Sequence, residues 1–198
     1  MVAPNQQTDV ELLALMSEGD EAAFTALYRR HQGVVYRFAA HMSNSAQTAE
    51  DVTQEVFIVL MRDAGRFDYT RGSLQSFLLG IARNYARRAF AHQNPYVQLD
   101  AEADDVSDRS DNPFEQFARD EAMRELHRAI MSLPTNFREA IVLCELQEMS
   151  YDEAATVIGC ATGTLRSRLH RARNMLTKKM RDAQKEIPQQ SFTAECLI

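Results

Sequence analysis

The chain has 198 residues, of which 45% are hydrophobic and 25% are charged, and its formal net charge is −6 at pH 7. These values are ordinary for a globular protein and exclude collagen-like, wholly disordered and disulfide-stapled chains. No apolar run approaches the roughly 18 residues that a membrane span needs, and the first residues lack the basic-then-apolar pattern of a signal peptide. With three cysteines and no Cys-x-x-Cys pair, we expect a cytoplasmic protein without membrane insertion.

The first three predicted helices each carry a start signal. A capping box at Thr8–Glu11 opens a short helix that Gly19 ends, and Asp20 caps a second helix. Thr48 begins a third helix with an apolar stripe. Its other face carries Asp51, Gln54, Glu55 and Ile58.

A fourth helix is predicted from Ser73, its cap, to about residue 90. Helical spacing places Leu74, Leu78, Ile81 and Tyr85 on the side predicted to face the core. The opposite side is small and basic, with Ser76, Gly80, Arg83 and Arg87. Such a surface suits close approach to a nucleic-acid backbone, and a solvated helix face is the alternative interpretation.

Residues 92–112 are polar and acidic and have little periodicity, which predicts a linker with little fixed structure. Helical periodicity resumes at 113 and is broken at Pro134. Thr135 is then predicted to cap a helix that reaches about Gln147, and a second capping box at Ser150–Glu153 opens another.

The most specific local pattern is a short helix over 151–158, a turn at 159–161 and a long helix capped by Thr162. Two helices joined by a tight glycine-containing turn are typical of a helix-turn-helix. Seven basic residues and no acidic residue lie between Arg166 and Arg181, despite the negative net charge. A basic stripe of this kind favours phosphate binding, although the same spacing also occurs in plain helical bundles.

Catalytic motifs are absent from the sequence. The five histidines show no metal-ligand spacing, and no phosphate-binding or nucleophile-elbow motif is present. Cys144 and Cys160 are interpreted as small core or turn residues rather than nucleophiles. We therefore expect no enzyme, no cofactor and no metal site.

Three blocks in register carry a family resemblance: AEDVTQEVFIVLMR, FDYTRGSLQSFLLGIARNYARR and LPTNFREAIVLCELQEMSYDEAATVIGCATGTLRSRLHRARNML. Together they resemble a bacterial RNA polymerase sigma factor of the extracytoplasmic-function (ECF) group of the sigma-70 family. The resemblance implies an all-α fold of two small helical domains joined by a flexible acidic linker. It divides the chain into a region 2 domain (1–93), the linker (94–112), a region 4 domain with the helix-turn-helix (113–181) and a tail (182–198).

The resemblance also implies a function and its residues. The protein would bind core RNA polymerase, direct it to −10/−35 promoters and assist melting, and we expect an anti-sigma factor as a further partner. By this resemblance, Asp51, Gln54 and Glu55 would contact the clamp helices of the largest polymerase subunit, and the flap of the second subunit would be a further contact. Binding of the −10 element falls to Phe67, Tyr69, Arg71, Ser73, Arg83, Asn84, Arg87 and Arg88. Binding of the −35 element falls to Thr162, Gly163, Thr164, Arg166, Ser167, His170, Arg171 and Arg173.

Two alternatives stay open at this point. The first is a freestanding helix-turn-helix transcriptional regulator that binds duplex DNA without polymerase, usually as a dimer. The second is a helical adaptor whose basic helix is only solvated. For Phe67 and Tyr69, packing against the helical bundle is as consistent with the sequence as base capture.

Overall fold

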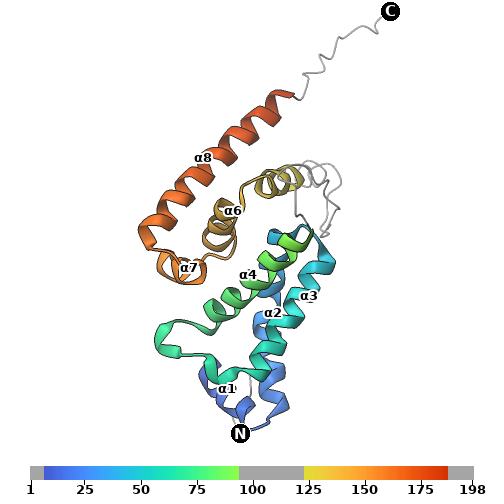
Figure 1. Cartoon of the computed structure of the whole chain (residues 1–198), viewed down its shortest axis with the longest axis vertical. Coiled ribbons are helices and arrows are strands. Elements are labelled where there is room, and N and C mark those ends of the chain that lie inside the picture. The colour runs from blue at the N-terminus through green and yellow to red at the C-terminus, as the bar shows by residue number, and fades with distance from the viewer. Residues whose placement is uncertain (1–6, 94–122, 187–198) are drawn as a thin grey trace, which may run out of the picture.

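The computed structural model describes residues 7–93 and 123–186, and every regular element in these two ranges is helical (Figure 1). The expected linker (94–112) lies outside the described residues. The tail expected from residue 182 is helical up to Glu186, where α8 ends, and the rest of it lies outside the described residues. The N-terminal part comprises α1 (Asp9–Ser17), α2 (Glu21–Ser43), α3 (Ala46–Arg62) and α4 (Leu74–Gln93). The C-terminal part comprises a helical stretch at 123–131, α6 (Thr135–Ile141), a π-helical turn η3 (Val142–Leu146), α7 (Tyr151–Ile158) and α8 (Thr162–Glu186). The all-α prediction is confirmed.

The N-terminal part is a bundle built around α2, which packs against α1, α3 and α4. The capping box at Thr8 and the cap at Asp20 form as predicted. Side chains from all four helices fill the interior, and those of Leu12, Phe38, Leu60 and Leu78 are completely buried. The bundle therefore fixes the positions of α3 and α4 and leaves Asp51, Gln54 and Glu55 on the outer face of α3 exposed.

Two helix starts differ from the sequence prediction. Ser45, not Thr48, caps α3: its hydroxyl accepts the Thr48 backbone N–H at 3.2 Å, and Thr48 lies inside the first turn. Thr135 is the first residue of α6, after an N-cap at Pro134 that supplies no side-chain hydrogen bond. The expected single helix from Thr135 to Gln147 changes after Ile141 into the π-helical turn, where hydrogen bonds span one residue more than in an α-helix.

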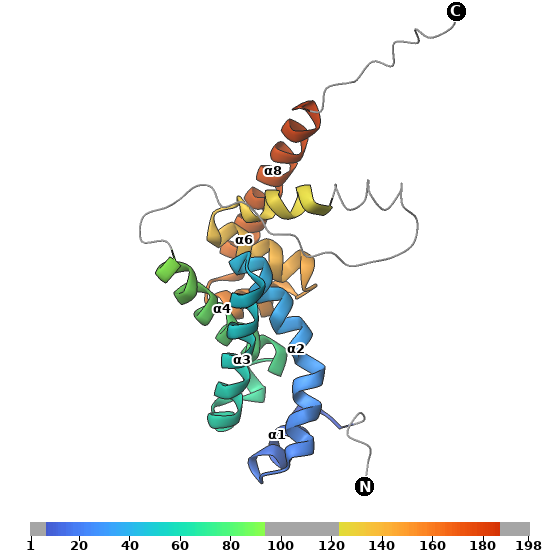
Figure 2. The same ribbon diagram turned by 90° about the vertical axis from the view of Figure 1, so that its right-hand side faces the viewer.

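The two parts pack directly against each other. Helix α7 lies against α4, and α6 and η3 contact α2 (Figure 2). Helix α8 packs on α6 and α7, and its C-terminal half extends away from the N-terminal bundle. One expectation for α4 is wrong: Ser76, expected on an open surface, is buried.

Candidate nucleic-acid and polymerase interfaces

The helix-turn-helix of α7 and α8 is held by local signals. Ser150 and Glu153 form the predicted reciprocal capping box at the start of α7. Gly159 ends α7 in the left-handed region, with φ 71°, where a residue without Cβ has no steric cost. The hydroxyl of Thr162 donates to Asp152 at 2.9 Å, so it ties α8 to α7 instead of capping α8 as predicted.

Helix α8 has a buried face and a basic face. Leu165, Leu169 and Ala172 are buried in the C-terminal core, as their spacing predicts. The predicted −35 residues are exposed except for Thr162, which is half-buried: Gly163, Thr164, Arg166, Ser167, His170, Arg171 and Arg173. A helix with small residues at its start and cations on one open face fits the major groove of duplex DNA.

Two residues next to α8 organise its arginines. The Arg173 guanidinium donates from Nε to Glu145 Oε1 at 3.1 Å. Hydrogen bonds with Glu145 and Tyr151 raise the pKa of Arg173 above its ordinary value. The Arg166 guanidinium carbon lies 5.7 Å from the centre of the Tyr151 ring, within cation–π range. Arg166 and Arg173 are thus held in place, while Arg171 makes no ion pair or ring contact with residues 7–93 or 123–186.

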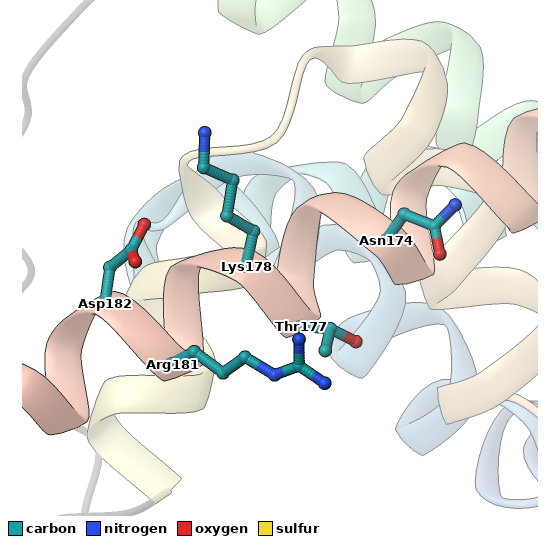
Figure 3. Close-up of a pocket in the computed structure, with 5 residues that line it drawn as sticks. All are labelled: Asn174, Thr177, Lys178, Arg181 and Asp182. Atoms are coloured by element: carbon teal, nitrogen blue, oxygen red, sulfur yellow. The ribbon is translucent and has the colours of Figure 1, made fainter.

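The basic face continues toward the C-terminal end of α8. A shallow hollow of about 390 Å³ is lined by Asn174, Thr177, Lys178, Arg181 and Asp182 (Figure 3). The ammonium of Lys178 and the guanidinium of Arg181 project from neighbouring turns of the helix. The cationic stripe therefore extends at least two turns beyond the predicted −35 residues.

On α3, the three predicted polymerase-contact residues Asp51, Gln54 and Glu55 are all exposed. Beside them lies an apolar groove between α2 and α3, with a volume of about 810 Å³. Its lining includes Gln54 and the exposed side chains of Tyr28, Ile58 and Met61. This face thus combines carboxylates with accessible apolar surface, as the surfaces of protein–protein contacts do.

The loop before α4 separates its two aromatic residues. Phe67 is half-buried and packs against Phe77, with ring centres 5.6 Å apart. Tyr69 is 69% exposed at the start of a short 3-10 turn, Tyr69–Arg71. Asp68 accepts the backbone N–H of Thr70 at 3.0 Å, and this bond stabilises the turn. Tyr69, Arg71 and Ser73 are thus presented to solvent and Phe67 anchors the loop.

The four predicted −10 residues of α4 divide into two pairs. Asn84 and Arg88 are exposed, and the Arg88 guanidinium carbon lies 6.0 Å from the Tyr85 ring centre. Arg83 and Arg87 instead contact the buried carboxylate of Glu139, which belongs to α6 in the C-terminal part. The prediction of one continuous open basic side on α4 is therefore wrong, because Ser76 is buried and Glu139 of the C-terminal part covers Arg83.

Within residues 7–93 and 123–186, no three His, Cys, Asp or Glu side chains converge in a way that would hold a metal ion. In the same ranges no helix has both the length and the apolar character needed to cross a bilayer.

The comparison with known proteins gives a family for this architecture. Residues 27–95 match the Sigma-70 region 2 family, and residues 123–176 match the Sigma-70, region 4 family. The RNA polymerase sigma-H factor of Pseudomonas aeruginosa is 32% identical over 192 residues, covering 91% of this chain and 98% of that protein. The ECF RNA polymerase sigma-E factor of Escherichia coli is 33% identical over 186 residues, covering 88% and 95%. The chain belongs to the ECF group of the sigma-70 family.

Solved structures agree with this assignment. CnrH in complex with the cytosolic domain of CnrY superposes with a TM-score of 0.66 at 27% identity, over 88% of this chain and 97% of that one. The sigma factor RpoE of Bartonella quintana, in complex with the anti-sigma factor NepR, shares the fold with a TM-score of 0.65. This ECF sigma factor is a transcription initiation factor that binds core RNA polymerase and directs it to promoters.

Sequence reasoning did not find three features of this sigma factor. Glu145 and Tyr151 are not identified from the sequence, because their proximity to Arg173 and Arg166 depends on the packing of η3 and α7 on α8. The sequence indicates the groove on α2 and α3 only in part: Ile58, an apolar residue, shares the polar face of α3 instead of its apolar stripe. Glu139 gave no local signal, since an isolated carboxylate in an amphipathic helix is ordinarily solvated.

Proposed function

We propose that the open basic face of α8 reads the −35 element of the promoter. The residues assigned to this task are Thr162, Gly163, Thr164, Arg166, Ser167, His170, Arg171 and Arg173. Gly163 and Ser167 let the helix approach the base edges, and the arginines supply donors to guanine edges or phosphates. The continuation of positive charge along Lys178 and Arg181 adds sequence-independent attraction to the same duplex.

The loop before α4 and the exposed part of α4 are assigned to the opened −10 element. Tyr69, projecting into solvent on an ordered turn, is the better candidate of the two loop aromatics for stacking on an unpaired base, because Phe67 is already packed against Phe77. Arg71, Ser73, Asn84 and Arg88 supply exposed donors for the strand. Arg83 and Arg87 join them once Glu139 is displaced.

Asp51, Gln54 and Glu55 on α3, with the neighbouring apolar groove, form the proposed docking face for the clamp helices of core polymerase. The region 4 domain is assigned to the flap of the second polymerase subunit. Exposed carboxylates beside accessible Ile58 and Met61 side chains support a mixed polar and apolar contact.

The proposed division of labour follows the predicted boundaries: residues 1–93 for core binding and the −10 element, 94–112 as a linker, 113–181 for the −35 element, and 182–198 as a tail. The protein would act without a catalytic centre or cofactor of its own, in the cytoplasm where bacterial RNA polymerase works. An anti-sigma partner is proposed because CnrH and RpoE were each solved with a bound protein partner.

The observation that supports the −35 assignment best is the open row of cations on α8 beside a fully buried Leu165–Leu169 anchor. Footprinting of the holoenzyme on one of its promoters tests it. Arg171→Ala should weaken protection around −35 by about 1–3 kcal/mol if Arg171 binds a base edge. Lys179→Ala, an exposed cation further along the helix, serves as the matched control. Equal weakening by both variants would contradict a base-reading role for Arg171.

A further inference from the structure

Polar links at three places join residues 7–93 to residues 123–186. The Arg138 guanidinium donates to the backbone carbonyl of Met42 at 3.1 Å, and His127 Nε2 lies 2.8 Å from Asn44 Oδ1. The third place joins α4 to α6, where Arg83 and Arg87 meet Glu139. The first two anchor the end of α2, whereas the third lies on a helix surface assigned to DNA.

Glu139 is an unusual residue at such a boundary, because its side chain is 0% exposed. Arg83 Nη2 donates to its Oε2 at 3.2 Å, and Arg83 Nε lies 3.0 Å from its Oε1. Arg87 Nη1 lies 3.6 Å from the same Oε1. The side chain of Arg83 is only 14% exposed, while that of Arg87 is 46% exposed. One carboxylate thus holds two cations of α4 and covers one of them.

We propose that the Arg83–Glu139 ion pair is an intramolecular latch that keeps this sigma factor closed and withholds Arg83 from single-stranded DNA. The proposal rests on the assignment of α4 to the −10 strand made above. In the closed state the Glu139 carboxylate occupies the place where a DNA phosphate would pair with Arg83. Opening separates α6 and α7 from α4 and exchanges this internal anion for the phosphate.

The same geometry makes the latch releasable. Burying an ion pair costs desolvation free energy on both partners, which is recovered only when every lone pair and N–H is well hydrogen-bonded. Here Glu139 Oε1 and Arg83 Nε are both buried, yet neither makes a hydrogen bond of good geometry despite their short separation. The pair is therefore incompletely compensated, and a polyanion that offers better-aligned oxygens competes with it.

The exposed Arg87 gives such a competitor a point of entry. Its guanidinium lies near Glu139 but remains open to solvent, next to the exposed Asn84 and Arg88. A strand that first contacts Arg87 and Arg88 brings its phosphates beside the latch without any prior opening. Binding of single-stranded DNA and opening of the chain are then coupled, and each favours the other.

The test uses the full chain and two measurements, the radius of gyration by small-angle X-ray scattering and the affinity for single-stranded DNA. The probe is a fluorescein-labelled AT-rich oligonucleotide of about 15 nucleotides, read by fluorescence anisotropy. Glu139→Gln removes the charge and keeps the shape of the side chain. Arg83→Gln breaks the same ion pair from the N-terminal side. If Glu139→Gln does not fold, the radius of gyration is measured on Arg83→Gln instead. Glu145→Gln is the matched control for the scattering measurement alone, because it removes the Arg173 ion pair within the C-terminal part. It is no control for DNA affinity, since Arg173 is itself assigned to DNA.

The latch predicts a larger radius of gyration for Glu139→Gln and Arg83→Gln than for the wild type and Glu145→Gln. It also predicts tighter DNA binding by Glu139→Gln. If the open fraction rises from about a tenth to about a half, the apparent Kd falls about fivefold. A folded Glu139→Gln or Arg83→Gln protein with the wild-type radius of gyration would overturn the proposal.

A double variant separates failure of the latch from failure of the assigned function. If Glu139→Gln opens the chain without tightening DNA binding, the claim that the latch withholds Arg83 is overturned. Adding Arg83→Ala to Glu139→Gln then decides what else fails. If the double variant binds DNA more weakly than Glu139→Gln alone, Arg83 contacts the strand and the assignment of α4 stands. If the two bind equally, Arg83 is removed from the −10 assignment as well.

Discussion

Two glycines of the helix-turn-helix provide a matched test of what determines its local structure. Gly159 lies in the turn with φ 71°, whereas Gly163 lies in the first turn of α8, outside the left-handed region. A Cβ added at either position meets no heavy atom within 4 Å, so packing does not distinguish the two sites. The difference between Gly159→Ala and Gly163→Ala therefore isolates backbone conformation.

The expected free energies follow from the two conformations. Alanine in the left-handed region costs about 1–2 kcal/mol. Replacing a glycine also reduces the conformational entropy of the unfolded chain, which stabilises the folded protein by about 0.4–1 kcal/mol. Gly159→Ala should therefore destabilise the folded protein by about 1 kcal/mol. Gly163→Ala replaces glycine in a helical conformation and should stabilise by roughly 0.5 kcal/mol. The two variants should thus differ by about 1.5 kcal/mol.

Urea unfolding followed by far-ultraviolet circular dichroism measures this difference, with unchanged m-values as the check that only stability has changed. The wild type should lie between the two variants. Equal midpoints for Gly159→Ala and Gly163→Ala, or a Gly159→Ala protein as stable as the wild type, would refute the account of the turn.

Three further predictions concern polymerase binding, pH and thiol chemistry. Replacing Asp51, Gln54 and Glu55 together by alanine should abolish co-elution with core polymerase and leave the helical circular dichroism unchanged, because all three are exposed; normal co-elution would contradict their assignment. Burial, followed by the nearby positive charge of His127 and Arg37, lowers the pKa of His41 below its ordinary 6.5. Protonation of His41 therefore favours the unfolded chain, and the free energy of unfolding should fall as the pH drops through and below about 6.5. The fall should be shallower in His41→Gln. Urea midpoints at pH 7.5 and 5.5 check this, and an equal loss of stability in the wild type and His41→Gln would contradict it. Burial and the charge of Glu145 raise the pKa of the Cys144 thiol to about 11. Iodoacetamide at pH 7.5 should therefore leave Cys144 unmodified in the folded protein and modify it in urea. Peptide mass spectrometry measures the modification, and equal modification in both states would contradict the prediction.

The features that the sequence predicts well depend on residues close together in the chain. The capping boxes at Thr8 and Ser150 and the left-handed turn at Gly159 are all set within a few residues. The inner face of α8 follows from helical periodicity alone. At the start of α3, two candidate caps lie three residues apart, and the composition of the segment does not decide between Ser45 and Thr48.

The features that sequence reasoning misses depend on tertiary contacts. Arg83 has the pattern of an exposed basic residue, but a carboxylate 56 positions further along the chain covers it. Tyr151 and Glu145 organise the arginines of α8 only because α7 and η3 fold back against it. Periodicity within a helix identifies which side chains share a face, but it does not say which other helix packs against that face.

The central claim is that this chain makes core RNA polymerase initiate at specific promoters. Run-off transcription with purified core polymerase and a genomic promoter library, with and without the protein, tests it most directly. The account predicts new transcripts that start downstream of a shared two-part motif, at −10 and −35. Absence of new transcripts, together with failure of the protein to co-elute with core polymerase, would contradict it and favour a freestanding helix-turn-helix regulator.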